Sequence, residues 1–324
     1  MAYLRFIPDV TNVDFVKWRY VAFAIDVLLL LVAIASILTR GFNLGIDFRG
    51  GVLLEAKAAH SIEISDVRAK VGSHGLNDVQ VQYVAGGTCD TPVRSCVLIR
   101  TRPVAGQTED AAAASIKQKL GSEFVFRNTE VIGPKVSAEL FRDGILATVL
   151  AVVMISIYVA VRFEWQYGIG ALIATGHDVF VTAGLYAFTQ LDFSINSVAA
   201  LLLLAGYSIN DTVVVFDRLR ENRRKFKRMP LAELINLSTN QIATRTTLVS
   251  VATALTIIPL LFFGGPALFD FSAAILFGIL VGTFSSTYVA SMLLLYLPSV
   301  GGQIRETAAQ GGMQPARDSA PGRS

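Results

Sequence analysis

The sequence predicts a membrane α-helical bundle of six transmembrane helices, with a small α+β ferredoxin-like domain inserted between the first and second helices. The chain of 324 residues is 53% hydrophobic and only 16% charged, whereas a typical soluble domain is about 25% charged. Six stretches are apolar enough to cross a bilayer, which takes about 20 residues. This composition argues against a cytosolic enzyme, a nucleic-acid binder and a disordered scaffold.

The predicted spans divide the chain into membrane and aqueous parts. A hydrophilic block, residues 40–142, separates the first span from the other five, which lie within residues 143–298. Residues 1–19 precede the first span. Residues 299–324 are rich in Gly, Ala, Gln and Pro and cannot bury a core, so we expect a disordered tail. The spans cover residues 20–39, 143–162, 168–189, 194–216, 242–263 and 269–298.

The first span has two interpretations. Ala33-Ile34-Ala35 matches the small-residue site at which a signal peptide is cleaved. However, Asp26 interrupts the apolar run, and hydrophobicity continues past the site to Leu38. We therefore favour an uncleaved membrane helix.

The distribution of basic residues predicts the orientation. Residues 217–228 hold seven Lys or Arg and two acids, whereas the loops at 190–193 and 264–268 hold no Lys or Arg. The positive-inside rule places residues 217–228 in the cytoplasm. Both termini are then cytoplasmic, and the block 40–142 lies on the opposite side of the membrane. Beside a membrane span, this basic run is better explained by topology and anionic lipid head groups than by nucleic acid.

The hydrophilic block predicts a small fold of its own. Alternating apolar residues and helix-forming composition give the order β-α-β-β-α-β, which is typical of a ferredoxin-like domain. No nucleophile and base stand in a pattern that indicates an enzyme. The predicted strands are residues 51–58, 78–84, 96–101 and 123–132, and the predicted helices are 64–72 and 109–120.

The chain has two cysteines, Cys89 and Cys96, on either side of a turn-rich loop. On the oxidising side of a membrane such a pair can close the loop as a disulfide, and the alternative is two free thiols. Two thiolates alone do not fill a tetrahedral metal site. The sequence therefore predicts neither a metal nor a cofactor.

Asp211 and Arg245 are charged residues within predicted spans, and such residues are functional candidates by default. We expect Asp211 about 9 Å from the cytoplasmic end of its helix, since a helix rises about 1.5 Å per residue. Arg245 lies at a comparable shallow depth on the next helix, so the two can pair. Two alternatives stay open: a static ion pair that joins the helices, or a switch in which a proton neutralises Asp211 and releases Arg245.

Three other polar residues in the spans are weaker candidates. Asp26 lies near the cytoplasmic end of the first span, from which its carboxylate can reach the interface. His177 and Asp178 form either a proton relay or a polar pair that serves packing.

Several motifs resemble the SecD/SecF family of bacterial protein-export membrane proteins. The first is Gly45-Ile46-Asp47-Phe48-Arg49-Gly50-Gly51 after the first span. The second is Val131-Ile132-Gly133-Pro134, where the family commonly has Val in place of Ile132. The others are residues 206–222, which include Asn210 and Asp211, and residues 240–246. The glycine motif is shared by SecD and SecF, and the single small outer domain favours the SecF branch.

The resemblance implies a function and partners. Members of the SecF branch form a heterodimer with SecD, of the RND class, in the bacterial inner membrane. They associate with SecYEG, YajC and YidC, and use the proton-motive force to pull exported unfolded preproteins after the ATP-driven step of SecA. The resemblance places Asp211, Arg245 and Asn210 in a proton pathway. The chain is then a transport subunit and not an enzyme.

Two other functions are compatible with the residues. One is half of an RND-type exporter of small molecules or lipids, and the other is a scaffold that only stabilises a channel. We interpret Gly45, Asp47, Phe48, Gly50 and Gly51 as a structural motif that couples the outer domain to the first span. Gly133 and Pro134 form the second joint, and the domain is expected to move on both joints as a rigid body.

Overall fold

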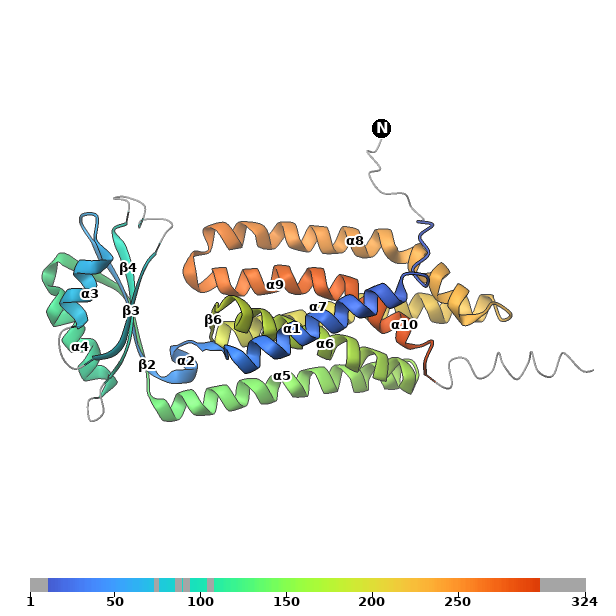
Figure 1. Cartoon of the computed structure of the whole chain (residues 1–324), viewed down its shortest axis with the longest axis horizontal. Helices are drawn as coiled ribbons and strands as arrows, with labels where there is room; N and C mark the ends of the chain where they lie inside the picture. Colours follow the sequence, from blue (N-terminus) through green and yellow to red (C-terminus); the bar gives the residue numbers. More distant parts are fainter. Residues whose placement is uncertain (1–10, 73–75, 85–88, 90–93, 104–107, 298–324) are drawn as a thin grey trace, which may run out of the picture.

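The computed structural model describes residues 11–72, 76–84, 89, 94–103 and 108–297. A long helical bundle carries a small α/β domain at one end (Figure 1). The first described residues and the end of the last helix lie together at the opposite end of the bundle. The predicted disordered tail, residues 299–324, lies outside the described residues, as do residues 1–10 of the N-terminal segment.

The bundle contains six helices that are long and apolar enough to cross a membrane, within the described part of the chain. Helix α6 is the most enclosed of the six: 56% of its most apolar 18-residue stretch is buried, against 6% of the corresponding stretch of α8. Helix α8 therefore lies at the edge of the bundle, beside α9 (Figure 1). The spans are α1 (Arg19–Thr39), α5 (Pro134–Arg162), α6 (Trp165–Thr189), α7 (Ile195–Lys225), α8 (Leu231–Phe263) and α9 (Gly265–Ser285), which continues through a π-helical turn, η3 (Ser286–Ala290), into α10 (Ser291–Leu293).

Three of these helices are longer than the sequence predicts. Helix α5 begins at Pro134, with Gly133 as its N-cap, so the outer domain ends before residue 142. Helix α7 continues to Lys225, and α8 already begins at Leu231. The basic run is therefore mostly helix and not a loop. The hydropathy pattern marks only the apolar part of each helix, because charged turns that leave the bilayer are equally helical.

The outer domain, Gly51–Ile132, has the predicted β-α-β-β-α-β order. Its four strands form an antiparallel sheet in the order β3-β4-β2-β5. Side chains alternate along β2, so that Val52, Leu54 and Ala56 are buried against the two helices. The helices cover the face of the sheet that points away from the bundle (Figure 1). The elements are β2 (Gly51–Ala58), α3 (Ile64–Gly72), β3 (Leu76–Tyr83), β4 (Cys96–Pro103), α4 (Glu109–Leu120), η2 (Gly121–Glu123) and β5 (Phe124–Ile132).

Three short elements between the two parts are not predicted by the sequence. Strand β1 (Asn43–Leu44) pairs in parallel with β6 (Asp192–Phe193), and α2 (Ile46–Arg49) follows β1. Strands of two residues are too short to show an alternating pattern. They attach the segment after α1 to the connection between α6 and α7.

Cys89 and Cys96 are joined by the disulfide that the sequence predicts, with their Cα atoms 5.2 Å apart. Cys96 begins β4 and is fully buried. The guanidinium of Arg127 on β5 contacts the sulfur of Cys89 and also forms an ion pair with Glu55 on β2. The bridge therefore lies against the sheet.

Candidate functional site

The glycine motif and the Gly-Pro motif meet at the junction between the outer domain and the bundle. Gly50 has a φ of +74°, and a Cβ at this position would lie 3.2 Å from the Ile132 oxygen and from the Cα of Pro134. Gly51 also has a positive φ and pairs with Ile132 across the β2–β5 ladder. Only glycine adopts such backbone angles freely. Both connections of the outer domain therefore touch each other.

The remaining motif residues attach this junction to α7. The carboxylate of Asp47 accepts a hydrogen bond of 2.9 Å from the Ile195 N–H, at the first residue of α7. The N–H of Gly45 donates to the Phe193 oxygen at 2.9 Å. Phe48 is buried, and its ring packs against Phe193 and the edge of Phe141. These contacts support the structural interpretation of the motif.

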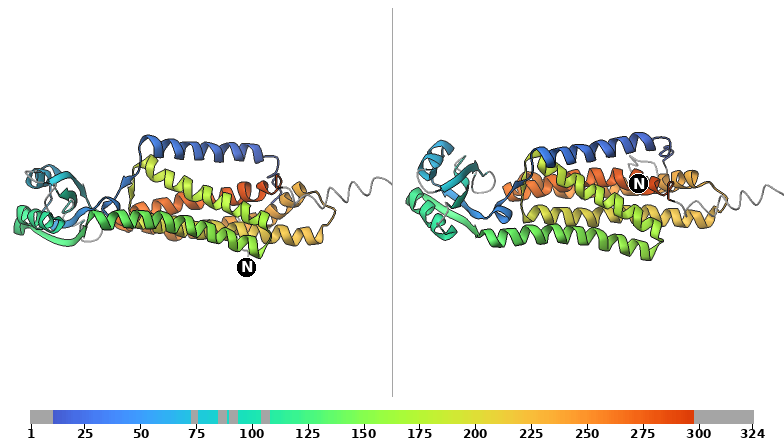
Figure 2. Two further views of the ribbon diagram at one scale, coloured as in Figure 1. Left: turned by 90° about the horizontal axis from the view of Figure 1, so that it is seen from below. Right: turned by 60° about the horizontal axis from the view of Figure 1, so that its bottom comes forward.

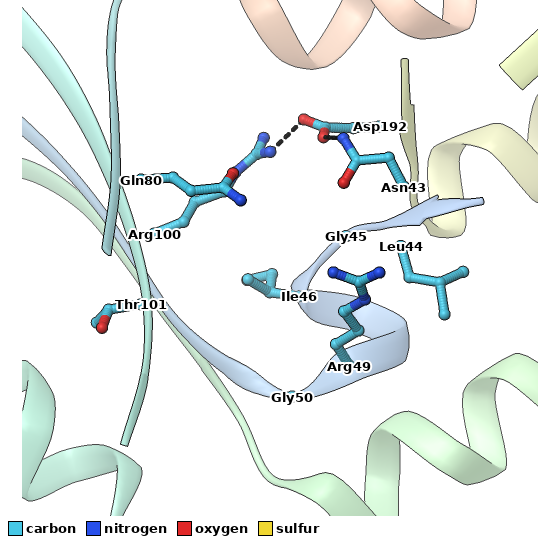
Figure 3. A pocket seen from close by; sticks show the side chains of 10 residues that line it. All are labelled: Asn43, Leu44, Gly45, Ile46, Arg49, Gly50, Gln80, Arg100, Thr101 and Asp192. Carbon is cyan, nitrogen blue, oxygen red and sulfur yellow. Dashed lines mark hydrogen bonds and ion pairs between the residues drawn. The ribbon is translucent and has the colours of Figure 1, made fainter. Parts of the chain in front are cut away.

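A charged contact joins the sheet of the outer domain to the bundle. The guanidinium of Arg100 on β4 forms an ion pair with the carboxylate of Asp192 on β6 (Figure 3). Asn43 on β1 donates a hydrogen bond of 2.9 Å to the same carboxylate, and the Asp192 N–H donates to Asp270 on α9. Asp192 thus connects three segments of the bundle with the outer domain.

Asp211 and Arg245 lie at matched distances from the connection between their helices, and farther from it than the sequence predicts. Asp211 lies fourteen residues before the end of α7, and Arg245 lies fourteen residues after the start of α8. At 1.5 Å per residue, each is about 21 Å from the connection between the helices. The predicted distance of about 9 Å from the end of the helix is therefore wrong, because both helices extend past their apolar parts.

The two side chains differ in environment. Asp211 is 3% exposed, and its Oδ2 atom has no hydrogen-bond partner among the described residues. Arg245 is exposed, and no ion pair within 4.0 Å joins the two side chains, both of which are described. Arg245 is nevertheless the charged group that acts electrostatically on Asp211. The predicted direct pair is therefore absent in this conformation, although the charges remain neighbours.

Arg245 lines a polar groove on the outside of the bundle. The groove has a volume of about 660 Å³ and lies between α5, α7 and α8. Asp217, Arg218 and Glu221 of α7 continue it toward the connection between α7 and α8. Asn210 is exposed, whereas the adjacent Asp211 is buried, so the two predicted pathway residues lie on different faces of α7.

The sequence does not predict the contacts of two sets of polar side chains inside the bundle. The Tyr207 hydroxyl donates to Ser250 at 2.9 Å, and Ser250 lies 2.7 Å from the Thr283 hydroxyl, so α7, α8 and α9 share one hydrogen-bonded chain. Asp26 is 4% exposed and faces α6, so it does not reach the interface as expected. Isolated Ser and Thr residues in apolar helices give no pattern from which such contacts could be predicted.

Two known family models together match most of the chain. Residues 112–300 match the family described as protein export membrane protein SecD/SecF, C-terminal. Residues 35–62 match the SecD/SecF GG motif, which contains the glycine junction described above.

Individual relatives agree with these matches. The chain is 39% identical to protein translocase subunit SecF of Cereibacter sphaeroides, over 91% of this chain and 92% of that protein. It is 36% identical to protein translocase subunit SecDF of Brucella abortus, over 94% of this chain but only 39% of that longer protein. The crystal structure of SecDF from Thermus thermophilus, a translocon-associated membrane protein, matches with a TM-score of 0.78 and 34% identity, over 90% of this chain and 39% of that one. This chain is a multi-pass membrane protein and belongs to the SecD/SecF family of protein-export membrane proteins.

Proposed function

We propose that the chain is the SecF subunit of a bacterial protein translocase, which works with SecD to couple the proton-motive force to protein export. It acts after the ATP-driven step of SecA and assists transport of unfolded preproteins through SecYEG, with YajC and YidC as further partners. It resides in the inner membrane with both termini in the cytoplasm and a ferredoxin-like domain in the periplasm. The observation that carries this proposal is the buried carboxylate of Asp211, whose Oδ2 atom has no hydrogen-bond partner among the described residues, at the same distance from the helix connection as Arg245.

The environment of Asp211 suits a proton-binding group. A charged side chain at the centre of a spanning helix costs about 2.5–3.5 kcal/mol on insertion scales. Asp211 has no hydrogen bond to Oδ2 that would offset this cost, and Arg245 acts on it without direct contact. A proton removes the charge of Asp211 and with it the attraction to Arg245. The position of Arg245 against α7 then depends on protonation.

The energy of one proton is sufficient for such a change. A proton that moves through a potential of about 150 mV releases roughly 3.5 kcal/mol. A few kcal/mol reverse the populations of two conformations that differ little in free energy. The polar groove that ends at Arg245 supports a route for water and protons from the cytoplasmic side.

The bundle leaves a surface for SecD. Helix α8 is exposed over most of its length, and Arg245 and Asn210 lie on exposed faces of α8 and α7. In the SecDF relative, a sequence similar to this chain occupies 39% of a longer chain. A separate SecD subunit would supply the remainder and cover α8.

The outer domain supplies the moving part. Its two connections meet at Gly50 and Pro134, so a rotation there displaces the whole domain. The Arg100–Asp192 ion pair holds the domain in the observed position. A change of the bundle on protonation of Asp211 reaches the domain through α7, whose first residue is bound by Asp47.

The alternative of a half-exporter for small molecules has less support, because the relatives are named as protein translocase subunits. A static scaffold would not require a buried titratable residue.

The test is proton-driven export by inner-membrane vesicles that contain the chain with SecD. The vesicles carry either the wild type or Asp211→Asn, with Asp143→Asn as the control at an exposed carboxylate of α5. We expect Asp211→Asn to assemble normally and to lose the stimulation of export by a proton gradient, while the control keeps it. Undiminished stimulation in Asp211→Asn vesicles would refute the proposal.

A further inference from the structure

Three titratable side chains of α1 and α6 form a buried cluster that the proposed function does not use. The Nδ1 atom of His177 lies 3.1 Å from Oδ1 of Asp178, and its Nε2 atom lies 3.8 Å from Oδ1 of Asp26. The side chains of Asp26, His177 and Asp178 are 6%, 9% and 0% exposed. The Asp26 carboxylate points toward His177. Neither of its oxygens has a hydrogen-bond partner among the described residues.

The close approach of α1 to α6 fixes the cluster. A Cβ on Gly184 of α6 would lie 2.3 Å from the Cβ of Ala33 on α1, so the two helices touch there through a glycine. Figure 2 shows the ends of α1 and α6 together at the end of the bundle next to the outer domain. Asp26 lies two turns before Ala33, and His177 lies two turns before Gly184. The carboxylate therefore cannot move far from the imidazole while the helices stay in contact.

The number of protons in the cluster determines its charge. Both ring nitrogens of His177 face oxygen atoms, and only a doubly protonated imidazole donates from both. With both carboxylates ionised and the imidazole protonated, the cluster carries one negative charge. Among the described residues, no Lys or Arg forms an ion pair with its members. One additional proton makes the cluster neutral, which favours its uptake in a membrane interior.

The cluster is connected to the helix that carries Asp211. The Ser208 hydroxyl of α7 donates a hydrogen bond of 2.6 Å to Oδ2 of Asp178. Ser208 is fully buried and lies one turn before Asp211. On the side of α9, Gly282 lies next to the Asp178 carboxylate and adds no charge. The printed contact between the cluster and α7 is thus the hydrogen bond from Ser208, one turn from Asp211.

We propose that Asp26, His177 and Asp178 form a second proton-binding site, which exchanges a proton with Asp211. When the proton leaves the cluster, the cluster changes from neutral to one negative charge, and Asp211 changes from ionised to neutral, so the total charge is constant. Within the cluster, the N–H bond at Nδ1 of the His177 imidazolium breaks as Asp178 gains its proton, and the O–H bond of Asp178 then breaks as the proton passes to Asp211, while the Asp26 carboxyl keeps its proton. The exchange rests on the proposed role of Asp211, whereas proton binding by the cluster does not.

The test is infrared difference spectroscopy between acidic and alkaline pH on vesicles that contain the full chain with SecD. We expect a protonated-carboxyl band that disappears in Asp26→Asn, changes frequency in His177→Gln and persists in the control Asp143→Asn. Asp26→Glu should restore a band. In Asp211→Asn the cluster band should persist but its pH titration should change, because a negative charge one turn from Ser208 has been removed.

The outcomes separate the two proposals. Carboxyl bands that are identical in the wild type, Asp26→Asn and His177→Gln would overturn the second site, and His177→Gln decides the matter if Asp26→Asn does not fold. Full proton-driven export by Asp211→Asn would overturn the role of Asp211 whatever the cluster bands show. A cluster band whose titration is unaffected by Asp211→Asn would overturn the exchange.

Discussion

Asp211 and Arg245 lie the same fourteen residues from the connection between their helices, yet one side chain is buried and the other is exposed. This arrangement differs from a static ion pair, whose partners would be locked together by direct contact. The switch is therefore the alternative that we propose and that the variants below test.

Arg245→Ala should impair proton-driven export without unfolding the bundle. The side chain is exposed and forms no ion pair within 4.0 Å with Asp211, so its loss should change stability by about 0.5 kcal/mol or less. Thermal unfolding of the purified protein and export by vesicles measure the two effects separately. A variant with full export, or one that loses stability in parallel with export, would contradict the assigned role.

Gly50→Ala should destabilise the junction by about 1–3 kcal/mol, because a side chain is strained at positive φ and meets Pro134. The matched control is Gly72→Ala, at a helical glycine of α3 that has open space around it. The control should be neutral or slightly stabilising. Denaturant unfolding of the outer domain in the full-length protein measures the change in stability for each variant. Equal changes in Gly50→Ala and Gly72→Ala would show that the junction does not require glycine at position 50.

Arg100→Asp should release the outer domain from the bundle, since two carboxylates would then face each other at β6. Arg100→Asp combined with Asp192→Arg restores opposite charges and should restore the position of the domain. Arg68→Ala, at an exposed position of α3, serves as the control. Distances between spin labels on α4 and α9 measure the position of the outer domain. An unchanged distance in Arg100→Asp would show that the Arg100–Asp192 ion pair does not hold the domain against the bundle.

The disulfide predicts no free thiol in the denatured, unreduced protein from native membranes, because Cys89 and Cys96 are the only cysteines of the chain. Cys89→Ser should retain export, since the loop between the cysteines is short and the sheet already holds β4 in place. A count of two free thiols, or loss of export in Cys89→Ser, would contradict this interpretation.

The sequence predicts best those features that depend on local pattern. Alternation along residues 51–58 gives β2 with its observed bounds, and composition gives α4. The distance of Asp211 from the end of its helix could not be predicted from local pattern, because hydropathy does not show where a helix ends beyond the bilayer. The contact between Asp26 and His177 could not be predicted either. It depends on how closely α1 approaches α6 at Gly184, which is a tertiary property.

We propose that Asp211 carries protons whose flow is coupled to export. The most direct measurement is proton flux during preprotein transport, followed with a pH-sensitive dye inside vesicles that contain the chain with SecD. We expect flux in the wild type that requires preprotein, reduced flux in Asp211→Glu and none above background in Asp211→Asn. Flux in Asp211→Asn equal to that of the wild type would show that Asp211 does not carry the protons.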